Sequence, residues 1–294
     1  MSDHELTTAA LPDAPRSTAA PAWYRVVGRG LAPTARVAAI PPAARTAYER
    51  AETIIAAAEP RCRLSWHLLA AVGGTSTDHG RVRSFRLVVT GLDEDGSARP
   101  AIVGPVLHAG ERGLVSDTDA GALDHDPAND RAVGPLHLSP TLWSHVGLDA
   151  DGDGVRDPQD VDDAALATAV LLCSTGLGLR SPESQTTALA QLNASAAFAR
   201  RVVRLAEAYR ADDALHPGTA PVAGPVPPGA PPSSDAASPQ ATTEVEEWFR
   251  THPDQRWRDA PSLSAWAPPP SPWVPTTPGT PPSPAADPTG PAQP

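Results

Sequence analysis

The stretch LLAAVGGTSTDHGR, Leu68 to Arg81, is the part of the chain from which the fold is best judged. Its first residues are continuously apolar and follow Ser65, a residue type preferred at helix N-caps. The spacing predicts a helix over 65–73. Two glycines and three hydroxyl residues then precede Asp78-His79-Gly80. An apolar helix that ends in this way is typical of a segment that presents polar side chains, and a carboxylic acid would be expected among them.

Composition divides the chain into three parts. Of the 36 prolines in 294 residues, 22 lie after position 211, so 212–294 is predicted to be a disordered tail. Residues 1–22 are polar and rich in alanine, and we expect disorder there as well. Residues 23–211 read as one globular domain. The net charge of −11 argues against a nucleic-acid partner, because such binding depends on basic surfaces.

Periodicity within the central part predicts a mainly α fold with one small β-hairpin. Helices are expected over 42–59, from 140, from 160 and over 181–211, the last as one or two segments. The hairpin is expected from strands 85–89 and 101–103, joined through a DEDG turn. A loop rich in Asp and Gly covers 108–130. A short helix over 244–250 interrupts the tail, whose partner the sequence does not identify.

The run DADGDGVRDPQD, Asp149 to Asp160, has the spacing of an EF-hand calcium loop. Alternate acidic side chains converge on one cation in such loops, a glycine at position 6 makes the turn, and position 7 donates a backbone carbonyl. The candidate ligands of a structural Ca²⁺ are Asp149, Asp151, Asp153, Val155, Asp157 and Asp160. Asp160 is shorter than the usual glutamate, so Asp162 could substitute for it. The alternative is a solvated acidic turn.

Two cysteines, Cys62 and Cys173, match no zinc spacing. They are either two separate buried thiols or one disulfide, which would indicate an oxidising compartment. The first 22 residues lack the basic and apolar regions of a signal peptide, and no stretch is long and apolar enough to span a membrane. The start site and the export route are therefore open.

Six collinear blocks between Ile40 and Tyr209 resemble the B-type lytic murein transglycosylases of high-GC Gram-positive bacteria. The blocks read IPPAARTAYERA, LSWHLLAAVGGTSTDHGR, PAIVGPVLH, DTDAGALDHDPANDRAVGPLHLSPTLW, DADGDGVRDPQDVDDAALATAVLLC and ALAQLNASAAF. The resemblance implies a helical, lysozyme-like fold with a small β element, and a calcium loop as in some members. It also favours a Cys62–Cys173 disulfide, an extracytoplasmic or cell-wall location, a monomer, and peptidoglycan glycan strands as the partner.

The family cleaves the MurNAc–GlcNAc bond without water and forms a 1,6-anhydro ring, using one glutamate as acid and then as base. The resemblance places Ser76 at that glutamate position, and a serine hydroxyl cannot protonate a glycosidic oxygen at useful rates. His137 stands where the family has a glutamine, after a retained Pro135. The family's Tyr-Asn pair is Leu192-Asn193, so the tyrosine is lost. The expected sugar-contacting residues are thus His79, Pro135, His137 and Asn193.

Three interpretations follow. The first is a catalytically impaired relative that binds glycan or serves as a scaffold. The second is an active lytic transglycosylase in which Asp78 replaces the acid. Within a helix, Asp78 would point about 160° away from Ser76, so this requires Gly73-Gly74 to unwind the helix. The third is a calcium-dependent interaction module without a sugar ligand. His79 has a structural alternative, since a histidine beside a glycine is commonly a hydrogen-bonded scaffold residue.

Overall fold

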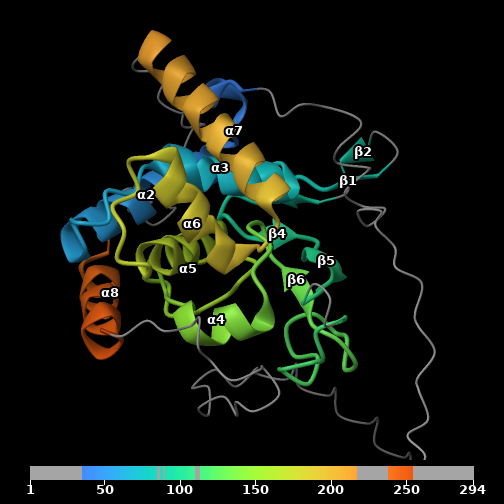
Figure 1. Ribbon diagram of the computed structural model, residues 1–294. Coiled ribbons are helices and arrows are strands. Elements are labelled where there is room, and N and C mark those ends of the chain that lie inside the picture. The colour runs from blue at the N-terminus through green and yellow to red at the C-terminus, as the bar shows by residue number, and fades with distance from the viewer. Residues whose placement is uncertain (1–34, 85–86, 89, 110–112, 217–237, 254–294) are drawn as a thin grey trace, which may run out of the picture.

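The computed structural model describes residues 35–84, 87–88, 90–109, 113–216 and 238–253, and within them the protein is mainly helical (Figure 1). The predicted segments 1–22 and most of 212–294 lie outside the described residues. The helices are η1 (Val37–Ala39), α2 (Pro42–Ala58), α3 (Trp66–Thr77), α4 (Pro140–Val146), α5 (Val161–Cys173), α6 (Pro182–Leu192), α7 (Ala196–Leu215) and α8 (Pro239–Thr251).

Helix α5 is the centre of the core. Every residue from Val161 to Cys173 is buried, and the helix packs against α2, α4 and α6. A helix that is apolar on all sides is expected to be enclosed by other elements. Helix α3 forms the second buried helix and packs mainly against α7, which crosses it (Figure 1). The core therefore contains two buried helices, each covered by amphipathic neighbours.

Helix α3 is longer than the sequence predicts, because it continues through Gly73 and Gly74 to Thr77. Isolated glycines lower helix propensity by about 1 kcal/mol each, which is why an end near Gly73 was expected. Here the glycines leave room for other side chains. A Cβ on Gly73 would lie 2.1 Å from the Tyr48 hydroxyl oxygen, and one on Gly74 would lie 3.0 Å from Nε2 of His79. Close packing therefore decides the residue type at both positions.

The β structure differs from the predicted hairpin. Within the described residues it consists of three short antiparallel pairs, and the DEDG turn joins β3 (Gly91–Leu92) to β4 (Ala98–Arg99). The predicted partner segment 101–103 instead leads into β5 (Val103–Val106), which pairs with β6 (Arg131–Val133). Pro100 has no N–H to donate, so it separates β4 from β5. The third pair is β1 (Arg83–Ser84) with β2 (Leu87–Val88); residues 85, 86 and 89 lie outside the described part.

Helix α8 belongs to the folded domain, although the sequence placed it in the tail. It packs against α2 and contributes Ala241, Val245 and Trp248 to the core. The Trp248 indole N–H donates to the carbonyl of His145 at 2.9 Å. Helix α7 likewise continues four residues beyond the predicted boundary at 211, to Leu215. The chain after 211 therefore supplies part of the core.

Cys62 and Cys173 form a disulfide, which settles the choice that the sequence alone left open. It joins the turn after α2 to the last residue of α5, and its Cα atoms are 5.3 Å apart. The backbone N–H of Leu179 also bonds to the Cys62 carbonyl, so the segment after α5 is fixed at the same point. Among the described residues, no helix is sufficiently long and apolar to cross a bilayer.

The first prediction concerns the disulfide. It closes a sequence separation of 111 residues, so the paired substitution Cys62→Ala with Cys173→Ala should lower the free energy of unfolding by about 3–5 kcal/mol. The expected fall in Tm is roughly 10 °C, measured by calorimetry. Wild-type protein unfolded under reducing conditions is the control and should match the variant. Equal Tm values for the oxidised wild type and the variant would contradict the prediction.

The second prediction concerns Gly73. The Gly73→Ala variant places a methyl group 2.1 Å from the oxygen of the buried Tyr48 ring. Overpacking should cost about 1–3 kcal/mol in urea unfolding, despite the better helix propensity of alanine. Gly91→Ala is the matched control, because a Cβ there meets nothing within 4 Å. A Gly73→Ala variant as stable as Gly91→Ala would refute the packing explanation.

Candidate functional site

The end of α3 is joined to a turn that lies far away in sequence. The Thr77 hydroxyl donates to the Pro135 carbonyl at 2.6 Å and accepts from the Gly80 N–H at 2.7 Å. Both bonds are buried, so each contributes to fixing the chain beyond the helix. Ser76, the position expected to carry a catalytic acid, is 6 % exposed. Two blocks that the resemblance assigns to one site are thus in direct contact.

The turn after β6 has an unusual backbone that orients His137. Gly134 has a φ of +73°, and a Cβ there would lie 1.7 Å from the Pro158 carbonyl oxygen, so only glycine fits. His137 also has a positive φ, of 56°. A Cβ on Gly104 of β5 would lie 3.1 Å from Nε2 of His137, so the ring is close to the β5 backbone. Burial lowers the pKa of His137 to about 4, and the ring is therefore neutral near pH 7.

Asp78 does not occupy the environment of a general acid. Helix α3 does not unwind at Gly73-Gly74; it ends at Thr77, and Asp78 follows in the left-handed conformation as the C-cap. Its carboxylate pairs with Arg81 at 2.9 Å, and its side chain is 32 % exposed. A carboxyl that is to donate a proton near neutral pH needs a desolvated site. The surroundings of Asp78 are of the opposite kind.

His79 is held inside the protein. It is 2 % exposed, and its Nδ1 and Nε2 lie 3.2 Å and 3.0 Å from the hydroxyl groups of Tyr48 and Tyr209. Burial lowers the pKa of His79 to about 3 and raises the pKa of both tyrosines. The neutral network links α2, the end of α3 and α7. Both ring nitrogens are therefore used by the scaffold, which is the structural alternative to the predicted sugar contact.

Asn193 is the C-cap of α6 and is exposed. Its side-chain oxygen accepts from the Ser195 N–H at 2.9 Å. Ser195 in turn caps α7 by accepting from the Phe198 N–H. The predicted helical region 181–211 is thus two helices separated by an asparagine turn.

The acidic run 149–160 forms a loop in which three predicted ligands converge. Oxygen atoms of Asp149, Asp151 and Asp153 lie within 4.8 Å of one another. Two oxygens at Ca²⁺ ligand distance from one ion are at most about 5 Å apart, so these three fit a calcium ion. Gly152 and Gly154 have φ values of +83° and +84°, as the sharp turns of the loop require.

Asp157 and Asp160 are not in this group of three. Asp157 accepts from the Gln159 N–H, and Val155 donates its N–H to Asp153. Asp160 caps α5 by accepting from the N–H groups of Asp162 and Asp163, and burial raises its pKa to about 7. Asp162, the proposed substitute, pairs with the buried Arg50 of α2.

Gln159 connects this loop to the turn that contains His137. Its amide oxygen accepts from the Ile102 N–H at 2.7 Å, and its amide nitrogen donates to the Ile102 carbonyl at 3.0 Å. The same carbonyl accepts from the Gly134 N–H at 3.0 Å. The loop and the end of α3 are therefore joined through Gln159, Ile102, Gly134 and Pro135.

Helix α8 covers the other side of the loop. Glu244 pairs with Arg156 at 3.1 Å, and a Cβ on Gly152 would lie 3.5 Å from the Ser238 hydroxyl oxygen. The Trp248 indole N–H donates to the carbonyl of His145, which precedes the loop. The Trp248 ring stacks on His252, with 4.6 Å between the ring centroids. The loop is thus joined to α8 through Arg156, and α4, which precedes the loop, is joined to α8 through His145.

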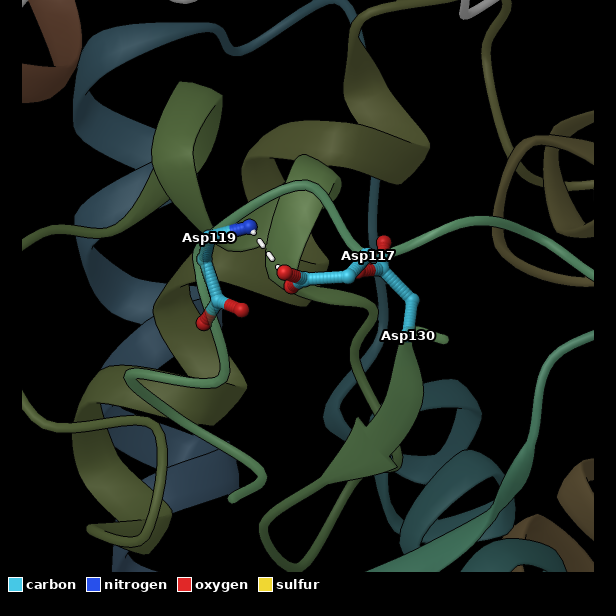
Figure 2. A group of neighbouring side chains, drawn as sticks. All are labelled: Asp117, Asp119 and Asp130. Carbon is cyan, nitrogen blue, oxygen red and sulfur yellow. Dashed lines mark hydrogen bonds between the residues drawn. The ribbon is translucent and has the colours of Figure 1, made fainter. Parts of the chain in front are cut away.

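A second group of carboxylates lies in the loop between β5 and β6. Oxygens of Asp117, Asp119 and Asp130 come within 4.8 Å of one another, and Figure 2 shows Asp117 between the other two. The Asp119 N–H donates to Asp117, and Asp130 accepts from the backbone and the hydroxyl of Thr118. These bonds fold the loop around the acidic group, as comparable bonds to Asp149 and Asp153 fold the first acidic loop, and the carboxylates of both groups are close enough to share a cation.

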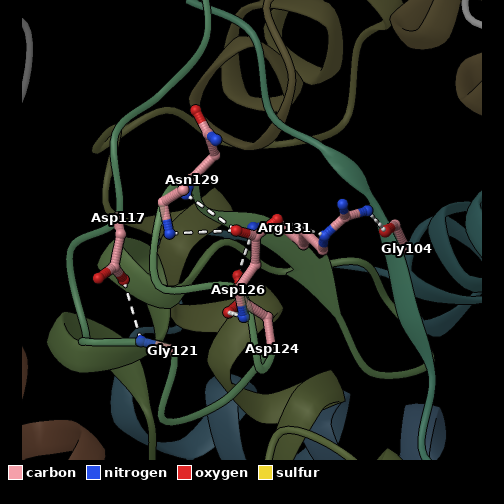
Figure 3. A network of polar contacts seen from close by, with 8 residues as sticks. Gly104, Asp117, Gly121, Asp124, Asp126, Asn129 and Arg131 are labelled. Atoms are coloured by element: carbon pink, nitrogen blue, oxygen red, sulfur yellow. Dashed lines mark hydrogen bonds and ion pairs between the residues drawn. The ribbon is translucent and has the colours of Figure 1, made fainter.

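The rest of this loop is built in the same way (Figure 3). Asp126 accepts from the N–H groups of Ala128 and Asn129 and pairs with Arg131 at 2.9 Å. The Ala128 bond is the main cause of the lowered pKa of Asp126. Arg131 also donates to the Gly104 carbonyl, which lies beside His137. The loop is therefore fixed against β5.

Sequence reasoning missed several of these residues. Tyr48 and Tyr209 are separated from His79 by 31 and 130 positions, and no local pattern marks the contact. Asp130 was read only as the end of a loop, although the DTD sequence at 117–119 was a visible signal for an acidic turn. No sequence pattern marks Gln159, because its role is to hydrogen-bond the backbone of Ile102, which is distant in sequence.

Three comparisons with known proteins give no match. No protein-family model matches the chain, and no curated protein or solved structure matches it at the threshold applied. The resemblance to lytic transglycosylases therefore depends on the residues quoted above.

The third prediction concerns pH. Folding lowers the pKa of His79 from 6.5 to about 3. Between these two pH values the His79 ring is therefore protonated in the unfolded chain and neutral in the folded protein. The contribution of His79 to stability should therefore rise with pH across this window, by up to about 1.4 kcal/mol per pH unit. The raised pKa values of Asp160, Asp162 and Asp163 act in the opposite direction. His79→Gln should remove the His79 contribution between pH 4 and 6, measured as the difference from the wild type in urea unfolding.

The exposed His108 gives a matched control as His108→Gln. This variant should keep the wild-type dependence. Part of the slope should remain in His79→Gln, because burial also lowers the pKa of His137 and His145. Unchanged slopes in His79→Gln would show that the buried ring does not resist protonation.

The fourth prediction concerns the acidic loop. Calcium should raise the Tm relative to a chelator, because a ligand that binds only the folded state stabilises it by about 2.7 kcal/mol at one hundred times its Kd. Asp151→Asn with Asp153→Asn should abolish this rise. Asp95→Asn removes an exposed acid elsewhere and should keep it. A rise of equal size in both variants would exclude a specific site in the loop.

Proposed function

We propose that this protein is a calcium-stabilised, lysozyme-like domain that binds the glycan strands of peptidoglycan without cleaving them. The observation that carries the proposal is the junction of Thr77 with Pro135 beside Ser76. It brings together two blocks that match the lytic transglycosylase pattern, and the acid of that pattern is replaced. A retained scaffold with a replaced acid favours binding over turnover.

The surroundings of Ser76 support the loss of catalysis. Asp78 is paired with Arg81 and partly exposed, and His79 is enclosed by two tyrosines. Neither residue is in a position to take over as a desolvated acid, which the reaction demands. His137, which is neutral near pH 7, and the exposed Asn193 are the polar residues proposed to contact sugar hydroxyls.

Calcium would act on structure rather than on chemistry. Asp149, Asp151 and Asp153 would hold the ion, and its charge would offset the mutual repulsion of the loop carboxylates. The chain's own residues then position the site, since Gln159 fixes Ile102 and thereby the turn at Gly134.

The fifth prediction tests the proposed function. Wild-type protein should sediment with purified, insoluble peptidoglycan and should release no 1,6-anhydro products detectable by mass spectrometry. Ser76→Glu should gain that activity if the remaining scaffold is whole, and Ser76→Gln is its matched control without an acid.

The outcomes separate the alternatives. Anhydro products from the wild type that disappear in Asp78→Asn would overturn the proposal in favour of a relocated acid. No sedimentation, with calcium or with a chelator, would overturn it in favour of an interaction module without a sugar ligand.

A further inference from the structure

The first turns of α7 carry a group of arginines without an ionic partner. Arg200 and Arg204 are exposed and Arg201 is half-buried, and none of them lies within ion-pair distance of a carboxylate in the described part of the chain. We refer to these three residues as the α7 arginine group. Among the other described arginines, Arg81, Arg131 and Arg156 pair with nearby acids, whereas Arg180 and Arg210 have no ion pair and stand singly.

This arrangement is unfavourable for the isolated domain. Arg200 and Arg204 are four residues apart, so like charges lie next to each other on one helix face. In a chain with a net charge of −11 and many acids, pairing would have been easy to arrange. An anionic partner would remove the repulsion between the two arginines.

The position of the group relates it to the proposed glycan site. Helix α7 starts directly after the turn formed by Asn193 and Ser195, and it crosses α3, whose end carries Ser76 (Figure 1). A polymer that contacts Asn193 would therefore lie close to the first turns of α7. Guanidinium groups bind carboxylates through paired hydrogen bonds, and at an exposed surface they act mainly on binding strength and salt dependence.

We propose that the α7 arginine group binds the carboxylates of the short peptides that branch from peptidoglycan glycan strands. The inference rests on the proposed function, because the glycan would bring the peptides to α7. The recognised ligand is then a peptide-bearing glycan rather than a bare sugar chain. The group recognises the acidic branches, while the residues around Asn193 contact the sugar.

The test is sedimentation with peptidoglycan freed of other wall polymers, either intact or stripped of its peptides by an amidase. Arg200→Gln with Arg204→Gln should bind intact material about threefold to tenfold more weakly than the wild type at low salt. The same variant and the wild type should bind the stripped glycan equally. Arg210→Gln with Arg180→Gln removes the same charge from outside the group and is the matched control.

Each result bears on a different statement. Equal binding of the wild type to intact and stripped material, with no effect of the double substitution, would overturn the inference and leave glycan binding standing. Equal weakening by the control pair would also overturn it, since net charge alone would then explain the effect. Failure of the wild type to bind either material would overturn both the inference and the proposed function.

Discussion

Three carboxylates at the start of the buried helix α5 connect this helix to α2 and to the acidic loop, and the rest of the fold depends on these connections. Asp160 caps the helix, Asp162 pairs with Arg50 of α2, and Asp163 accepts from the N–H groups of Ala150 and Asp157. Burial raises the pKa of Asp163 to about 9, although the N–H bonds from Ala150 and Asp157 act to lower it. The helix N-terminus, the arginine and the loop backbone therefore offset only part of the cost of burying these three acids. Removing any one of them would leave a buried acid without compensation.

These contacts explain why the domain needs both ends of α5. The first turn attaches the acidic loop and α2, and the last residue attaches the turn after α2 through the disulfide. Helix α2 is thereby fixed to α5 at two points. Tyr48 of α2 can then hold His79 at a constant position, and with it the chain beyond α3.

The sequence predicts those elements whose signals are local. The helix at 42–58 follows from Pro42 and from apolar spacing, and α4 follows from Ser139 and Pro140 at its start. The continuation of α3 through Gly73 could not be predicted, because it depends on a tyrosine from another helix. The docking of α8 depends in the same way on a carbonyl of α4 that receives the Trp248 N–H.

In the candidate site, too, the features with local sequence signals were predictable and those that depend on distant residues were not. The spacing of Asp149, Asp151 and Asp153 in the sequence was sufficient to group them, since a loop of alternate acids turns its side chains inward. The contact between Pro135 and Thr77 was expected only from the family resemblance, because neither segment carries a local sequence signal for pairing with the other. Neither residue spacing nor the family resemblance predicted the environment of Asp78. It depends on where α3 ends, and that end is set by the packing of Tyr48, His79 and Tyr209 around the two glycines.

If the protein binds glycan as proposed, the connection from the acidic loop to the turn at Gly134 would give the loop a role in that binding. Gln159 bonds to both backbone groups of Ile102, and the Ile102 carbonyl holds Gly134, whose neighbour Pro135 holds Thr77. A cation that rigidifies the loop would therefore reduce the freedom that the turn loses when a ligand binds. Because a ligand costs less to bind when its site is already ordered, cation binding and glycan binding would favour each other without any large movement.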